Sequence, residues 1–234
     1  SETLKRSLVY NQREIPIWWN VLIALIGSDE AAANVVRAAL YEYAYPFPPG
    51  TVADLGNIRK ADAGQLIPIL YELITGKVVP IVIGRSNDDA RGQFLAYQEA
   101  KALANWTAVD EVLRTSLLAP LFTPRHPLLF HFSLIGTQSH LMYPSHQKLL
   151  EDNNFELLRL GRSRTALEEA EPILRDADLL TFHLNALRNA PSASPSGFFL
   201  EEACQLTRYA GMSDKLTSFG VYGFEPEKDR DSRG

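Results

Sequence analysis

Short apolar runs alternate with longer amphipathic stretches along most of the chain, and this alternation restricts the fold more than any other feature. Several runs are apolar on both faces, as are the strands of a parallel sheet that helices cover on both sides. The eight predicted strands are residues 21–27, 51–56, 78–84, 106–110, 128–136, 155–161, 178–187 and 216–224. An eight-stranded barrel and an open doubly wound sheet both fit this order. The open sheet is slightly favoured, because no helical pattern follows the last run.

The stretches between these runs carry the periodicity and the end signals of helices. The predicted helices cover residues 30–44, 62–76, 165–177 and 200–211. Gly76 suits the position just past a helix end, and Thr165 with Glu168 forms a capping-box pattern. The helix at 200–211 is predicted to bury one apolar stripe, formed by Leu200, Ala203, Leu206 and Ala210.

Several serine and carboxylate side chains are better explained as helix caps than as catalytic groups. Ser145 and Lys148 match an SxxK pattern, but Ser145 follows a proline and is predicted to cap a helix. Asp88 and Asp89 are predicted to cap the helix after the third strand. No phosphate-binding glycine loop and no GxSxG turn occurs in the sequence.

Length and composition indicate one α/β domain over residues 1–234, with a charged and mobile tail at 225–234. The net charge of -5 argues against nucleic acid, which needs a concentrated basic face. The apolar run at 15–27 is too short to span a bilayer and is read as part of a buried strand. The single cysteine, Cys204, excludes an internal disulfide, fits a cytoplasmic protein and is predicted to be a packed, inert thiol.

Few chemically capable side chains stand at the carboxyl ends of the predicted strands, where α/β proteins gather their active sites. Asp110 ends the strand at 106–110, while His183 and Asn185 alternate at the end of the strand at 178–187 and point the same way. The other histidines show no spacing typical of zinc ligands; they are His126, His131, His140 and His146. By these residues alone, the rim of the sheet is polar and poor in charge.

The segment at 176–226, DADLLTFHLNALRNAPSASPSGFFLEEACQLTRYAGMSDKLTSFGVYGFEP, resembles the C-terminal half of the ureohydrolases, the superfamily of arginase, agmatinase and formimidoylglutamase. The chain looks most like the formimidoylglutamase branch, and PIVIGRSNDDARGQFLAYQ, VADLGNIR and FHFSLIGTQSHLMYP extend the resemblance. The resemblance implies a three-layer αβα fold around a mainly parallel, eight-stranded sheet. It also implies two manganese ions that convert water to hydroxide for attack on a guanidino or formimino carbon.

The metal ligands of these enzymes are largely replaced in this chain. The resemblance places the six ligand positions on Asn87, Asp110, Val112, Arg114, His183 and Asn185. Asp110 alone matches the family ligand, and His183 offers a substitute donor, so these two are the predicted metal ligands. Neutral amides and a cationic Arg114 cannot offset two dications, which predicts a degenerate site and no manganese cofactor unless the site still functions.

Three functions remain open on these residues. The first is a protein that has lost its manganese centre and acts by binding or assembly. The second is a hydrolase of formimidoylglutamate, arginine or agmatine at a one-metal site of Asp110 and His183 with Asp88 or His140. The third is a sensor of a small amidine or amino acid, with Arg85 as a candidate carboxylate-binding residue. A homo-oligomer is expected as well, because no helical pattern follows the last strand to cover it and a subunit contact would bury its apolar surface.

Overall fold

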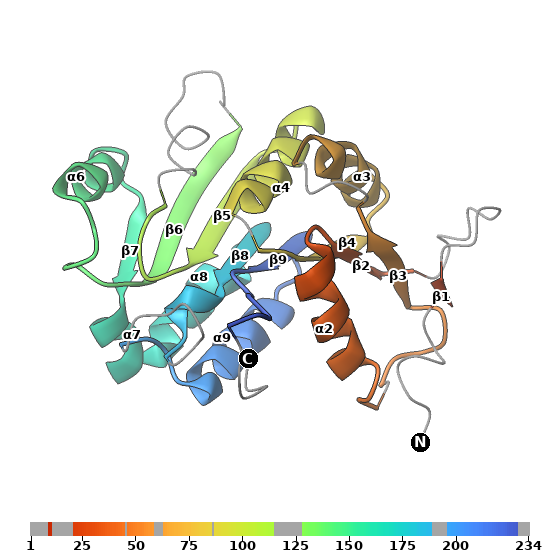
Figure 1. The fold of residues 1–234 in the computed structure, drawn as a ribbon. Helices are drawn as coiled ribbons and strands as arrows, with labels where there is room; N and C mark the ends of the chain where they lie inside the picture. Colours follow the sequence, from red (N-terminus) through yellow and green to blue (C-terminus); the bar gives the residue numbers. More distant parts are fainter. Residues whose placement is uncertain are drawn as a thin grey trace.

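The computed structural model describes residues 9–10, 21–44, 46–58, 63–85, 87–114, 128–188 and 196–228. All the strands it describes belong to one parallel sheet in the order β1-β3-β2-β4-β9-β8-β5-β6-β7 (Figure 1). They are β1 (Val9–Tyr10), β2 (Ile23–Gly27), β3 (Val52–Asn57), β4 (Val79–Ile83), β5 (Ala104–Val109), β6 (Leu129–Thr137), β7 (Glu156–Arg159), β8 (Leu179–His183) and β9 (Ser218–Tyr222). The eight predicted strands are confirmed, and the two-residue β1 is added at one edge.

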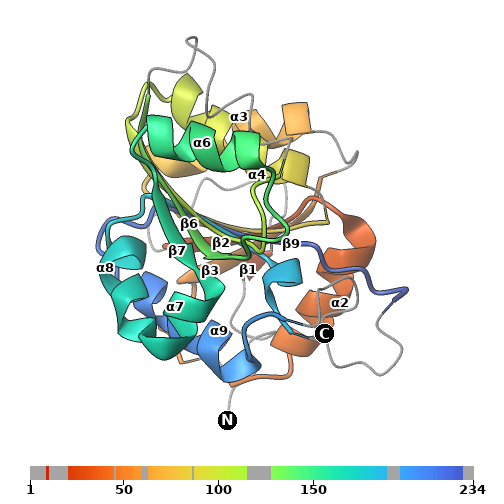
Figure 2. The ribbon, with the colours of Figure 1, turned by 90° about the vertical axis from the view of Figure 1, so that its left-hand side faces the viewer.

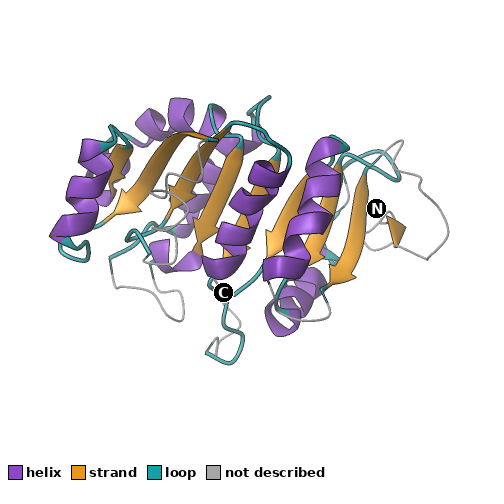
Figure 3. Ribbon diagram, turned by 90° about the horizontal axis from the view of Figure 1, so that it is seen from above, coloured by secondary structure: helices purple, strands orange, loops and turns teal. Residues whose placement is uncertain are grey.

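Helices cover both faces of the sheet and complete three layers. The helices are α2 (Glu30–Leu40), α3 (Ala63–Thr75), α4 (Asn87–Glu99), α6 (Pro144–Asp152), α7 (Leu160–Thr165), α8 (Ala170–Arg175) and α9 (Leu200–Gly211), with short 3-10 turns η2 (Leu167–Glu169) and η3 (Leu184–Ala186). Helices α3, α4 and α6 lie on one side of the sheet and α2, α7, α8 and α9 on the other (Figure 2). Seen from above, the strands run side by side between the two helical layers and do not close into a barrel (Figure 3). The three-layer αβα fold is therefore confirmed.

Each helical layer packs on its own apolar core. On the α4 side, the fully buried Trp106 stacks on Phe94 at 5.2 Å between ring centroids and meets Phe132 edge-on at 5.6 Å. On the α9 side, Phe182 and Phe198 belong to a second buried cluster. Because alternate residues of one strand point to opposite faces, β5 contributes Trp106 to the first core and Val109 to the second.

Two predicted caps are wrong. Thr165 is the last residue of α7, and its hydroxyl donates to the carbonyl oxygens of Gly161 and Arg162 instead of capping a following helix. The helix predicted at 165–177 consequently begins later, as η2 and then α8. Ser145 lies inside α6, which starts at Pro144 after the N-cap residue Tyr143 and has no side-chain cap. A proline at N1 already fits the helix start, because its missing N–H would have no helical partner.

Helix α9 buries a narrower stripe than its sequence predicts. Ala203, Leu206 and Ala210 are buried, but Leu200 is 69% exposed at the first position of the helix. Cys204 is exposed, so the prediction of a packed thiol is wrong. One residue along a helix turns the side chain by roughly 100°, which carries Cys204 away from the sheet that Ala203 contacts.

The last strand is central and not a surface strand. Strand β9 pairs with β4 on one side and β8 on the other, and helix α4 packs on it. Its alternate residues Ser218, Gly220 and Tyr222 are buried. The reasoning that an uncovered last strand needs a subunit contact is therefore wrong. Of the predicted tail, residues 225–228 are described and the rest lies outside the described residues, as do His126 and residues 15–20 of the long apolar run. No helix in the described part of the chain is long and apolar enough to cross a membrane.

Candidate functional site

The predicted ligand positions lie at one edge of the sheet, where the parallel strands end. Asn87 is the first residue of α4, directly after β4, and Asp110 directly follows β5. His183 ends β8, and Asn185 lies in the 3-10 turn that follows. Strands β4, β9, β8 and β5 are consecutive neighbours in the sheet, so the fold gathers segments that are far apart in the sequence.

Asp110 lies at this edge, and Arg114 forms a salt bridge with its carboxylate. The side chain is buried, with the residue 3% exposed. Its Oδ2 accepts from Nε of Arg114 at 2.9 Å, and its Oδ1 accepts from Nη2 of Arg114 at 3.0 Å and from the backbone N–H of Glu111 at 2.7 Å. This is the two-pronged geometry in which a guanidinium binds a carboxylate most strongly.

Arg114 is held as a cation in this position. Burial disfavours its charge, but the hydrogen bonds and charge of Asp110, aided by the charge of Glu111, raise the pKa of Arg114 above its ordinary value. An Oε1 of Glu111 lies 3.5 Å from Nη2 of Arg114. The resemblance predicts a manganese ion beside this carboxylate. In this chain the positive charge beside it is carried by the Arg114 side chain.

His183 offers no free lone pair in the arrangement observed. Its Nδ1 accepts a hydrogen bond from the backbone N–H of Asn185 at 3.2 Å. In a neutral imidazole one nitrogen accepts and the other carries the proton, so this contact assigns the proton to Nε2. Burial lowers the pKa of His183; the charge of Asp110 opposes this, the charge of Arg114 adds to it, and Glu225 opposes it. A neutral ring protonated on Nε2 cannot bind a metal through that atom.

The residues at this edge therefore do not fit a binuclear manganese centre. Val112 brings a hydrocarbon side chain and Asn185 a neutral amide, while the carboxylate of Asp110 already accepts three hydrogen bonds. The described residues hold no group of three or more His, Cys, Asp or Glu side chains that could bind a metal ion. Asp88 and His140, the further ligands considered for a one-metal site, are both exposed.

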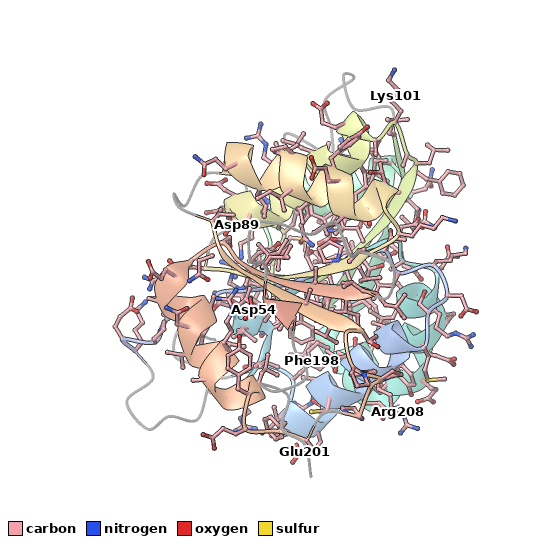
Figure 4. The ribbon with its side chains drawn as sticks, turned by 90° about the vertical axis from the view of Figure 1, so that its right-hand side faces the viewer. Asp54, Asp89, Lys101, Phe198, Glu201 and Arg208 are labelled. Atoms are coloured by element: carbon pink, nitrogen blue, oxygen red, sulfur yellow. The ribbon has the colours of Figure 1, made fainter. Side chains whose placement is uncertain are left out.

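A buried polar network beneath the site was missed by sequence reasoning. The hydroxyl of Ser28 donates to Oδ2 of Asp89 at 2.7 Å, and Nε2 of Gln93 donates to the hydroxyl of Ser218 at 2.6 Å. The hydroxyl of Tyr222 donates to Oε1 of Gln93. Asp89 lies on the α4 side of the sheet (Figure 4), and its carboxylate accepts from Ser28. Both Asp88 and Asp89 lie inside the first turn of α4, which begins at Asn87, and not at the predicted N-cap position. The four-residue spacing of Asp89 and Gln93, which places both on one face of a helix, is the sequence signal that could have predicted this network.

Arg85 is engaged by the end of the chain. Its guanidinium donates to both carboxylate oxygens of Glu227, at 2.7 and 3.0 Å, and lies 3.5 Å from Asp29. The hydrogen bonds to Glu227 raise the pKa of Arg85, and the nearby acids outweigh the opposing effect of burial. The segment 225–228 thus folds back beside the strand ends, and Arg85 already holds a carboxylate of the protein.

Solved structures of known proteins share this fold. The Bacillus subtilis formimidoylglutamase aligns with a TM-score of 0.77 at 14% identity, covering 96% of this chain and 84% of that chain. A Trypanosoma cruzi formiminoglutamase solved with manganese gives 0.78 at 16% identity, with 92% and 89% covered. The agmatine ureohydrolase of Thermoplasma volcanium gives 0.72 at 15% identity, with 98% and 88% covered. No protein-family model and no curated protein matches the sequence.

These comparisons establish the arginase-like, or ureohydrolase, fold for the chain. The structures that share it include formimidoylglutamases, so the resemblance read from the sequence is confirmed at the level of the fold. At such identities the comparison says nothing about which side chains do chemistry, and the site has to be judged by its own residues.

The buried His183 predicts a pH dependence of stability. Its pKa is lowered on folding from an ordinary value of 6.5, so below that pH the unfolded chain binds a proton that the folded protein does not. The free energy of unfolding should therefore fall as the pH drops from about 7.5 to about 5. Urea unfolding across this range should show a shallower fall for His183→Gln than for the wild type. His140→Gln, at an exposed histidine, should keep the wild-type slope; an unchanged slope in His183→Gln would contradict the prediction.

Proposed function

We propose that this chain is a ureohydrolase-superfamily protein of the formimidoylglutamase-like branch that has lost the binuclear manganese centre and acts by binding or assembly. The bidentate pair of Arg114 with the buried Asp110 is the observation that carries the proposal. The remaining four positions supply a hydrocarbon, two amides and a neutral histidine whose Nδ1 is already an acceptor.

The electrostatics of this pair argue against a dication at the same carboxylate. A metal ion at Asp110 would have to displace a guanidinium that makes two hydrogen bonds in a partly buried place. If Arg114 stayed nearby, its charge would repel the ion, and the repulsion grows as water is excluded. If Arg114 swung away, a buried, well-formed ion pair would be broken at substantial cost.

The binding role supported by this fold is recognition of a small amidine or amino acid at the former catalytic edge. Asn185 and the backbone groups of the strand ends would orient such a ligand without catalysing a reaction. A cytoplasmic location and a homo-oligomeric state are part of the same proposal.

Metal content and turnover test this function together. After incubation with manganese and dialysis, we expect elemental analysis to find no manganese retained and no hydrolysis of formimidoylglutamate, arginine or agmatine. The matched variant replaces Val112 with His and Arg114, His183 and Asn185 with Asp, which restores carboxylate and imidazole donors at those positions. Manganese retention by this variant alone would support the proposal. Two ions per wild-type chain, as in the manganese-bound formiminoglutamase, would overturn it.

A further inference from the structure

A cavity opens at the edge of the sheet opposite the candidate site, where the strands begin. It has a volume of about 340 Å³ and lies between strands β5, β6 and β7 and the covering segment η2–α8. Ligand sites of proteins begin at about this size. Thr107 in its wall is three residues before Asp110 on the same strand, on the order of 10 Å along the strand, so the cavity is separate from the candidate site.

One row of polar side chains crosses the floor of this cavity. Thr107 of β5 is paired in register with Ser133 of β6, and Ser133 with Glu156 of β7. Register partners in a parallel sheet point to the same face, and the next residues along these strands on that face are Val109, Ile135 and Leu158, which belong to the apolar core beneath α8 and α9. The row therefore borders the apolar core, and the polar residues Asn105 and His131 continue this face toward the start of the strands.

The two hydroxyls of this row are buried and unused. Thr107 is 2% exposed and Ser133 is 4% exposed, and both line the cavity. Neither hydroxyl has a hydrogen-bond partner within the part of the chain that the structure describes. Both residues line the cavity, so water or a polar group of a ligand can serve as the hydrogen-bond partner of each hydroxyl.

The wall of the cavity is rich in acceptors and negatively charged. Nδ2 of Asn105 donates to Asp176, which leaves Oδ1 of Asn105 buried without a partner in the described residues. Glu169 is paired with Arg162, and Asp176 with Lys215. Glu156 is exposed at the edge of the cavity and makes no ion pair with any described residue, and no lysine or arginine is among the residues that line the cavity.

We propose that this cavity binds a small organic cation with a second hydrogen-bond donor, a short diamine being the simplest. Its ammonium group would pair with Glu156 and donate to Ser133, and its second donor would reach Thr107, one strand further across the sheet. Neighbouring strands are spaced by roughly 4.8 Å, which suits an extended ligand. A metal ion is a poor fit, because these carboxylates do not converge into a group of three donors.

Calorimetric titration with 1,4-diaminobutane tests the inference, with 1,4-butanediol as a neutral probe of similar shape. We expect the diamine to bind the wild type and the diol to bind at least tenfold more weakly. Because Glu156 is exposed, Glu156→Gln should weaken diamine binding about fivefold, the upper end for an ion pair in contact with water. Ser133→Ala and Thr107→Val should each weaken it less. None of the three substitutions makes the side chain appreciably larger than the one it replaces.

Glu201→Gln is the matched control, because Glu201 is an exposed carboxylate on the outer surface of α9 (Figure 4). It should bind the diamine like the wild type. The inference is overturned if the wild type shows no binding at millimolar diamine, or if diol and diamine bind equally. Diamine binding that Glu156→Gln leaves unchanged also overturns it, since binding at the Asp110 edge would behave in that way.

Discussion

Replacing Arg114 with leucine is expected to lower the free energy of unfolding by about 3 kcal/mol, the low end of the cost of breaking a buried ion pair. The carboxylate of Asp110 would remain buried, with its side chain 4% exposed, after losing two of its three hydrogen bonds. The estimate is at the low end because 24% of the Arg114 side chain is exposed. Urea unfolding at neutral pH measures this loss.

Two companion variants separate the ion pair from a general packing effect. Asp110→Asn combined with Arg114→Leu should recover much of the stability, because the uncompensated charge is then gone. Arg162→Leu breaks an arginine–glutamate contact of similar geometry on the surface and should change stability little. If Arg114→Leu proved as mild as Arg162→Leu, the pair would not be the structural replacement for a metal that we infer.

Replacing Gly136 with alanine is expected to destabilise the fold by about 2–5 kcal/mol, the sum of a left-handed backbone penalty and an overpacked core. Gly136 has a φ of +89° at an irregularity in the pairing of β6 with β7. A Cβ there would lie 2.5 Å from Cε2 of Phe198, which is fully buried. Both the backbone and the ring would have to shift, and urea unfolding reports the total.

Gly50 provides the matched control for this substitution. Its φ is +83°, but a Cβ added there would meet nothing within 4 Å. Gly50→Ala therefore isolates the backbone penalty, about 1 kcal/mol, and the difference between the two variants measures the clash with Phe198. Equal effects at both positions would show that Phe198 does not constrain the site.

The pair of Asp110 and Arg114 balances a buried charge at the end of a central strand. Asp110 ends a central strand in a place that excludes most water, so its charge must be balanced by something. In this chain the balancing charge is covalently attached four residues further on, in a segment that also supplies a backbone N–H. The protein's own side chains thus supply the charge balance at that strand end.

The local pattern of the sequence was sufficient for the elements of the fold. The runs of apolar residues predicted all eight of the longer strands, and periodicity predicted helices α2, α3 and α9, because both signals are set by neighbours within a few residues. The positions of Asp110, His183 and Asn185 at strand ends followed from the same pattern. Local rules failed at Thr165 and Cys204, where contact with the rest of the protein decided which face is buried.

Only the tertiary structure decided what those side chains do. The place of β9 between β4 and β8 depends on pairing between residues far apart in the chain, which no local pattern specifies. The proton on Nε2 of His183 follows from one backbone N–H, and the bidentate contact of Arg114 follows from the path of a loop with no helix or strand. The sequence by itself determined which residue types stand at the strand ends; the geometry around them decided that their charges and lone pairs are already used by the protein.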